Sequence, residues 1–268
     1  MRKHLFVVIR PVTASILLCM LSTSCTPTSA PNSNSHRILF IGNSLTYAND
    51  MPAMVDAIAR ADGNPYSVQS VATPNTGLID HATMGPAQSR IAEGGWQVVI
   101  LQQGPTPAGV CRDTLVMATK ILDRSIRAVG ARTASLMTWP YDGYPDAFSW
   151  VHESVQQASK AVNGIFLPAG DAWVAARRID PSLQLYGPDG YHPSQLGSLL
   201  TAFVVYQGVT GRDVRQITSE LRLPGTSIDP ATVQLLEFAT HAVFLPATVP
   251  AANATRNSAP SAKIRATC

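Results

Sequence analysis

The sequence has few cysteines, and they form no metal-binding pattern. The four cysteines of the 268-residue chain include no Cys-x-x-Cys pair, and no histidine and cysteine cluster has ligand spacing. This absence disfavours a metal-dependent hydrolase, and we expect neither a metal nor a cofactor. Cys111 and Cys268 could pair in an oxidising compartment, but their spacing does not decide whether they do.

The sequence also lacks a long basic run, a long apolar lid segment and an internal repeat. The formal net charge is +3, and Arg2, Lys3 and Arg10 carry all of it, which leaves the chain after its first 24 residues neutral. Proteins that bind nucleic acid usually carry clustered Lys and Arg. We therefore expect no nucleic-acid partner.

Residues 1–25 have the pattern of a signal peptide. A basic start precedes an apolar stretch that Arg10 and Pro11 interrupt, which favours a cleaved signal over a spanning helix. The residues before Cys25 resemble a bacterial lipoprotein cleavage site, which would give membrane attachment through a lipidated Cys25. Ordinary cleavage after Ala30 is the alternative. Either way we expect an exported protein, which is periplasmic, secreted or anchored as a lipoprotein.

The rest of the chain divides into a linker, one domain and a tail. Residues 26–35 are rich in Ser, Thr, Pro and Asn and predict a flexible linker, while the Ala, Pro and Ser content of residues 246–268 predicts a disordered tail. The domain spans residues 36–245, a length that suits a single core.

Strands and helices alternate within this domain. Strands are predicted at 37–42, 66–72, 96–101, 132–138 and 165–168, and helices at 51–61, 78–92, 113–129, 146–163, 172–179, 194–207 and 229–243. This alternation predicts a single three-layer α/β/α domain around a five-stranded parallel sheet with right-handed crossovers.

A serine follows the first predicted strand. The apolar run of residues 38–41 ends at Gly42, and Ser44 comes two residues later. A continuous apolar run is typical of a strand buried on both faces, and glycine allows backbone angles that permit a sharp turn. Ser44 is then expected at the carboxyl end of a central strand, where open α/β sheets bind ligands. A serine there could act as a nucleophile if a base lies nearby.

A matching acid and base occur late in the chain. Asp189 and His192 are three residues apart in a loop rich in glycine and proline. One turn of chain would let the carboxylate reach one imidazole nitrogen and leave the other free, as a serine nucleophile requires.

These blocks resemble those of the SGNH (GDSL-type) hydrolases. Gly42-Asn43-Ser44-Leu45 is similar to the Gly-Asp-Ser-Leu block of that superfamily, and Asp189 to His192 is similar to its Asp-x-x-His block. The resemblance covers roughly residues 36–210 and implies a flavodoxin-like fold and a Ser44, His192, Asp189 triad. Asn43 replaces the commoner aspartate, at a position outside the triad.

The resemblance also implies an oxyanion hole. Its candidate donors are the backbone N–H groups of Ser44 and Gly77 and one side chain from the third block. Relatives usually carry an asparagine in that block, but here Gln102 and Gln103 stand there, and the sequence leaves open which of them contributes. Trp139 follows the fourth predicted strand, where it would either contact substrate or pack in the core.

The function that these features favour is that of an exported serine esterase. The neutral mature chain and the missing lid favour short acyl esters, with O-acetyl groups on carbohydrate as one class. The alternative is a non-catalytic surface lipoprotein that keeps the fold and binds glycan, which the missing third-block asparagine and the tether after Cys25 favour. The sequence does not determine the oligomeric state.

Overall fold

The structure is a computed structural model that describes residues 36–217 and 228–245. The predicted signal peptide with Cys25, the predicted linker and the predicted tail with Cys268 lie outside the described residues. Within the described ranges, no helix has both the length and the apolar character needed to cross a membrane.

Five parallel strands form one sheet in the order β2-β1-β3-β4-β5. The strands are β1 (His36–Gly42), β2 (Tyr66–Ala72), β3 (Val98–Gln102), β4 (Arg132–Leu136) and β5 (Ile165–Leu167). The chain moves outward in one direction from β1 to β2 and in the other from β3 to β5. The strand order therefore reverses between β1 and β3, and the loops that follow these two strands lie where open α/β sheets bind their ligands.

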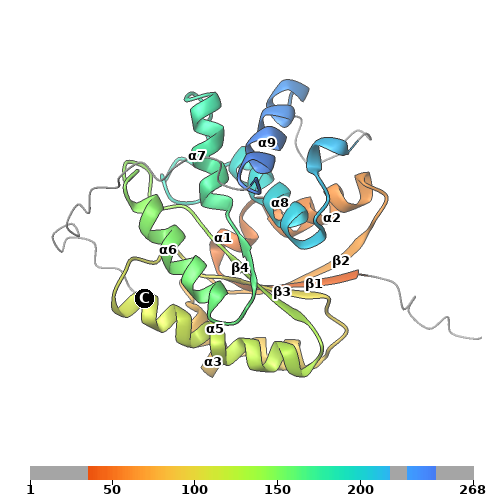
Figure 1. Ribbon diagram of the computed structural model, residues 1–268, viewed down its shortest axis with the longest axis vertical. Coiled ribbons are helices and arrows are strands. Elements are labelled where there is room, and N and C mark those ends of the chain that lie inside the picture. Colours follow the sequence, from red (N-terminus) through yellow and green to blue (C-terminus); the bar gives the residue numbers. More distant parts are fainter. Residues whose placement is uncertain (1–35, 218–227, 246–268) are drawn as a thin grey trace, which may run out of the picture. The chain divides into compact units, whose positions relative to one another are not determined.

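Helices cover both faces of the sheet (Figure 1), so the predicted three-layer fold is confirmed. One face carries α2 (Met51–Ala61), α7 (Ala169–Ile179), α8 (Gln195–Thr210) and α9 (Pro230–Ala242). The other carries α3 (Leu78–Thr83), α4 (Ala87–Ala92), α5 (Val110–Ala128) and α6 (Ala147–Lys160). Three short elements complete the described chain, namely α1 (Ser44–Tyr47), η1 (Ala48–Asp50) and η2 (Val214–Gln216).

The central strand β1 divides the core into two halves. Ile38 and Phe40 pack with the helices of the first face, and Leu39 and Ile41 pack with those of the second. All four side chains are fully buried because the sheet is covered on both sides. This double burial explains why β1 reads as a continuous apolar run rather than an alternating one.

The helices begin and end within three residues of their predicted bounds, apart from the division of one of them. The predicted helix 78–92 bends as expected and forms two helices, α3 and α4, separated at Gly85, which has a φ of +83°. Asp229 caps α9 by accepting a hydrogen bond from the Thr232 N–H, at 2.9 Å. Asp50 occupies the N-cap position of α2 in a left-handed conformation and makes no side-chain cap bond.

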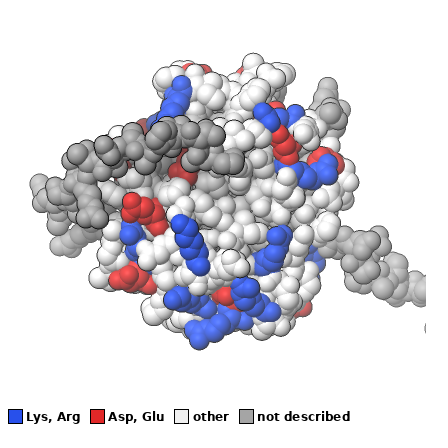
Figure 2. Space-filling view, viewed as in Figure 1, with Lys and Arg blue, Asp and Glu red and all other residues white. Residues whose placement is uncertain are grey.

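Charged side chains of both signs share the surface. Figure 2 shows Lys and Arg gathering on one face over the region where Figure 1 places α5, with acidic side chains among them. Three arginines of this layer are paired, as Arg90 with Glu93, Arg112 with Glu153 and Arg127 with Asp123. The positive charge of this layer is therefore partly offset by neighbouring carboxylates.

Candidate active site

Ser44 lies where β1 turns into the short helix α1. Asn43 is the N-cap of this helix, and its Oδ1 accepts a hydrogen bond from the Leu45 N–H at 3.1 Å. The Asn43 amide nitrogen donates to the Thr76 carbonyl at 3.3 Å, which an aspartate could not do. The replacement of aspartate by Asn43 therefore joins the nucleophile turn to the loop after β2.

Gly42 is needed here for space rather than for backbone angles. A Cβ on Gly42 would lie 2.3 Å from Thr46 Oγ1 and 2.4 Å from Gln102 Oε1. Gly42 is not among the residues with positive φ. The expectation that this turn needs the backbone angles of glycine is therefore wrong. Glycine is needed because the side chains of Thr46 and Gln102 approach its Cα too closely for a Cβ.

The loop that carries His192 is organised by Asp189. One oxygen of Asp189, Oδ1, accepts hydrogen bonds from the N–H groups of Tyr191, at 3.0 Å, and His192, at 2.9 Å. The Gly187 N–H donates to the His192 carbonyl at 2.7 Å, and Gly190 turns the chain with a φ of +65°. Hydrogen bonds among its own residues therefore hold the motif in this conformation.

The structure brings Ser44, His192 and Asp189 together in one hydrogen-bonded chain. His192 Nε2 lies 2.9 Å from Ser44 Oγ, and His192 Nδ1 lies 2.6 Å from Asp189 Oδ2. With Nδ1 protonated and donating to the carboxylate, Nε2 presents a lone pair to the serine hydroxyl. This is the geometry that a serine nucleophile and its general base require.

The hydrogen bond from His192 is the main reason that the pKa of Asp189 is lowered, to about 2. Asp189 is therefore ionised across the neutral range and can hold the imidazole in one tautomer. The His192 and Asp189 side chains are 41% and 52% exposed, so solvent reaches the site directly.

Asn49 connects the nucleophile segment to the histidine loop. Its side-chain nitrogen donates to the Pro193 carbonyl at 2.8 Å and lies 2.9 Å from Ser198 Oγ. Its backbone is left-handed, with a φ of +53°, a conformation that asparagine tolerates better than most residues. Nothing in the local sequence indicates that Asn49 has a partner 144 residues away.

The backbone donors predicted for the oxyanion hole differ in availability. Among the described residues, no hydrogen-bond acceptor contacts the Ser44 N–H. The Gly77 N–H, by contrast, donates to Asp80 Oδ2 at 2.9 Å, as the N-cap of α3. The predicted Gly77 donor is therefore already occupied in this arrangement.

Gln102 and Gln103 hold the turn after β1 and the start of α3 by hydrogen bonds. Gln102 is fully buried, and its Oε1 accepts from the Asn43 N–H, at 2.9 Å, and from the Thr46 hydroxyl, at 2.7 Å. Its Nε2 is enclosed and has no partner among the described residues. Gln103 Oε1 accepts from the Leu78 N–H at 2.6 Å. An enclosed amide cannot reach a ligand, so the expectation that Gln102 donates to an oxyanion is not met.

Trp139 does not contact the surface of the site. Its side chain is 1% exposed and stacks on Trp173, with ring centroids 3.8 Å apart. Its indole N–H donates to the Tyr191 carbonyl at 3.0 Å. The prediction that Trp139 binds substrate is therefore corrected: it supports the histidine loop from within the core.

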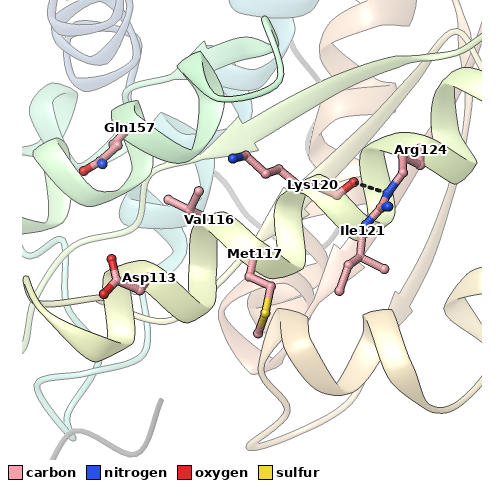
Figure 3. A pocket seen from close by; sticks show the side chains of 7 residues that line it. All are labelled: Asp113, Val116, Met117, Lys120, Ile121, Arg124 and Gln157. Atoms are coloured by element: carbon pink, nitrogen blue, oxygen red, sulfur yellow. Dashed lines mark hydrogen bonds between the residues drawn. The ribbon is translucent and has the colours of Figure 1, made fainter.

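The structure has a shallow hollow of about 500 Å³ away from the triad. Figure 3 shows Gln157 of α6 facing residues along α5, and the lining comprises Asp113, Val116, Met117, Lys120, Ile121, Arg124 and Gln157. These side chains lie along two helices and not at the strand ends that carry Ser44. The hollow is therefore not part of the candidate active site.

The fold is shared with solved structures of hydrolases. A protein described as a candidate SGNH hydrolase from Slackia heliotrinireducens is 26% identical, covers 65% of this chain and 99% of its own, and has a TM-score of 0.57. The esterase EstA from Pseudoalteromonas sp. is 15% identical, covers 66% of this chain and 98% of its own, and has a TM-score of 0.50. The fold and its structural neighbours are therefore those of the SGNH hydrolases, as the sequence motifs predict.

A third neighbour shows that the likeness extends beyond enzymes with a described activity. A DUF4886 family protein from Bacteroides uniformis is 18% identical, covers 78% of this chain and 94% of its own, and has a TM-score of 0.63. No family model matches the sequence, and no curated protein matches it. The similarity at these identities defines the fold, and the chemistry has to be argued from the site.

Proposed function

We propose that the protein is an exported serine esterase that hydrolyses short acyl esters, with O-acetyl groups on carbohydrate as the favoured class. The observation that carries this proposal is the continuous hydrogen-bonded chain from Ser44 through His192 to Asp189. The exposed triad and the absence of a long apolar lid in the sequence favour a short acyl group.

The reaction has two halves. His192 Nε2 takes the proton of Ser44 as Oγ attacks the ester carbonyl carbon, and it then returns that proton to the alcohol oxygen as the carbon–oxygen bond breaks. Water attacks the resulting acyl-serine, again losing its proton to His192. Collapse of the second tetrahedral intermediate releases the carboxylic acid and restores the serine hydroxyl. Asp189 holds the imidazole and stabilises its charged form.

The oxyanion that forms in each half needs donors fixed in advance. The Ser44 N–H is the first donor, because the structure leaves it without an acceptor in the described chain. The Gln103 amide is the second, since the Leu78 N–H fixes its oxygen and thereby orients the group. Each such donor lowers the barrier by roughly 3 kcal/mol.

Export is proposed from the sequence alone. The basic start, the interrupted apolar stretch and Cys25 support a periplasmic, secreted or lipid-anchored location in a bacterium. Mass spectrometry of the mature N-terminus tests this, and diacylglycerol on Cys25 is the result expected for a lipoprotein. A mature protein beginning after Ala30 would instead indicate ordinary cleavage.

The activity is tested with the full chain and 4-nitrophenyl acetate. We expect hydrolysis by the wild type that Ser44→Ala and His192→Ala both abolish and that a chelator does not affect. The competing function is binding of glycan without turnover, which the engaged Gly77 N–H and the enclosed Gln102 amide favour. A folded wild type that hydrolyses neither this ester nor acetylated sugars would support the binding protein.

A further inference from the structure

Two tyrosines form an aromatic stack directly beside the general base. Tyr141 lies in the loop between β4 and α6, and Tyr191 lies inside the Asp189–His192 motif. Their ring centroids are 4.3 Å apart with an interplanar angle of 22°. The Tyr191 ring also meets the His192 imidazole edge-on, with centroids 5.2 Å apart and an angle of 78°. The stack therefore extends outward from the base.

The backbone around the stack holds it in place. The Asp142 N–H donates to the Gly190 carbonyl at 2.8 Å, and the buried Trp139 donates to the Tyr191 carbonyl. A Cβ on Gly104 would lie 3.3 Å from the Tyr191 hydroxyl, so Tyr191 reaches across to the loop after β3. A stack fixed in this way is preorganised for binding and loses little conformational entropy when a ligand arrives.

The outer face of the stack is open and has a polar rim. Tyr141 is 50% exposed although Tyr191 covers one face of its ring. Next to it in the chain, the exposed Asp142 carboxylate accepts a hydrogen bond from Arg177 at 3.2 Å. An open aromatic face beside exposed charged groups suits a ligand that has both a face of C–H groups and several hydroxyls. A pyranose ring has both, whereas an alkyl chain has no hydroxyls for the rim.

The position of the stack indicates which half of an ester it would contact. In the proposed reaction His192 gives its proton to the departing alcohol oxygen, so groups that touch the imidazole lie near the alcohol half. The acyl oxygen is held at the Ser44 N–H. A ring stacked on Tyr141 would thus belong to the alcohol and not to the acyl group.

We propose that Tyr141 is a specificity-determining residue that stacks on a sugar ring in the alcohol half of the substrate. This inference rests on the proposed esterase function, since it names the substrate class for the same site. It predicts selectivity for acetylated carbohydrate over acetyl esters whose alcohol has no ring.

The test compares two exposed tyrosines of the same loop. Tyr141 is stacked on Tyr191, whereas the 53% exposed Tyr144 has no aromatic stacking partner in the described chain. Acetate release is measured from acetylated xylo-oligosaccharides, glucose pentaacetate and methyl acetate. We expect Tyr141→Ala to lower the kcat/KM ratio of sugar ester to methyl acetate roughly 3- to 10-fold, mainly through KM. Tyr141→Phe keeps the ring and should keep the ratio, and Tyr144→Ala should behave as the wild type.

Two results would overturn the proposal while leaving the esterase intact. One is an unchanged ratio in Tyr141→Ala, and the other is an equal fall in Tyr144→Ala. Hydrolysis of 4-nitrophenyl acetate without hydrolysis of any acetylated sugar would do the same.

If the wild type hydrolyses no ester, the catalytic proposal fails and binding decides the role of Tyr141. Calorimetric titration of the Ser44→Ala chain with the same acetylated xylo-oligosaccharides would then be compared with the Ser44→Ala, Tyr141→Ala chain. Loss of binding in the double variant supports stacking of the sugar ring on Tyr141. Equal binding by both chains, or no binding by either, refutes it.

Discussion

Two of the histidine–aspartate pairs in the described part of the chain have nearly equal geometry. In the triad, His192 Nδ1 lies 2.6 Å from Asp189 Oδ2, and between α6 and α7, His152 Nδ1 lies 2.7 Å from Asp171 Oδ2. Both imidazoles are partly exposed, at 41% and 32% of the side chain. The acid and base alone therefore do not distinguish a candidate active site from a surface contact.

The two pairs differ in the residue that faces the other imidazole nitrogen, Nε2. His192 Nε2 faces the Ser44 hydroxyl at 2.9 Å, whereas His152 Nε2 faces the amide nitrogen of Gln156 at 3.0 Å. A hydroxyl can give up a proton and attack, but an amide nitrogen can only donate a hydrogen bond. A histidine–aspartate pair becomes a triad only where a nucleophile faces the second imidazole nitrogen. Here the turn after β1 places Ser44, 148 residues away in the sequence, beside His192.

The largest expected effect separates the two histidines. His192→Ala should lower kcat/KM for 4-nitrophenyl acetate by at least about 10³-fold, because Ser44 loses the base that takes its proton. The matched variant His152→Ala removes a histidine from the other pair and should keep wild-type activity. Initial rates of both, with circular dichroism to verify folding, check this. Equal losses in the two variants would contradict the assigned roles.

The carboxylates give the next effect. Asp189→Asn should lower kcat by roughly 10²- to 10⁴-fold, because the amide no longer stabilises the charged imidazole or fixes its tautomer. Asp171→Asn is the control and should leave kcat unaffected. Steady-state kinetics of each variant at several pH values measure the difference. A fully active Asp189→Asn enzyme would place the orienting carboxylate elsewhere.

A smaller effect is expected where the nucleophile turn is braced. Gln102→Leu leaves the Asn43 N–H and the Thr46 hydroxyl without their acceptor and should lower kcat roughly 10- to 100-fold with little change in KM. Gln102→Glu keeps an acceptor oxygen for these two donors and should recover part of the loss. The folded fraction is measured alongside by thermal unfolding. If activity falls only in proportion to the fraction of folded protein, Gln102 contributes to stability and not to the arrangement of the site.

The smallest expected effect is on how the thermal stability of the protein depends on pH. The hydrogen bond to Asp171 raises the pKa of His152 above its ordinary value, so the folded state binds a proton more tightly than the unfolded chain. The stabilisation is fully present below about pH 6.5, the unfolded pKa, and is lost as pH rises through the raised folded pKa. Asp171→Asn should therefore lower the Tm at pH 5.5 more than at pH 8.5.

A second group complicates this test and defines its control. Burial, with the nearby Asp213 adding to it, raises the pKa of Glu237 to about 7, which also makes the protein less stable as pH rises from about 4.5 to 7. Only the difference between wild type and Asp171→Asn isolates the His152 pair. A difference in Tm that is constant across this range would contradict the raised pKa as its cause.

Local patterns were sufficient to predict most of the fold. The sequence predicts a strand at 66–72, where β2 lies, and a helix at 51–61, which matches α2. These segments carry their own periodicity and end signals. The chain enters α2 through two left-handed residues, Asn49 and Asp50, which the helical periodicity of residues 51–61 does not indicate.

The candidate site was predictable only in part. Ser44 and the Asp189–His192 motif stand in short blocks whose residue types already specify their chemistry. The assignments of Gly77, Gln102 and Trp139 depended on where side chains point and which partners they meet. The Asp80 carboxylate at the Gly77 N–H is a contact between residues three positions apart at the start of α3, and the family motif does not include it. The burial of Trp139 against Trp173, by contrast, joins segments that local sequence does not connect.

The sequence by itself determined the alternation of buried strands and helices, and with it the parallel sheet and the edge at which Ser44, Asp189 and His192 would meet. Only the tertiary structure decided that His152 pairs with Asp171, that Gln102 braces the turn and that Tyr141 stacks beside the base. The physical reason is the separation in sequence between the residues that make these contacts. Periodicity and turn chemistry act over a few residues, whereas these contacts join segments that become neighbours only when the sheet and its helices pack.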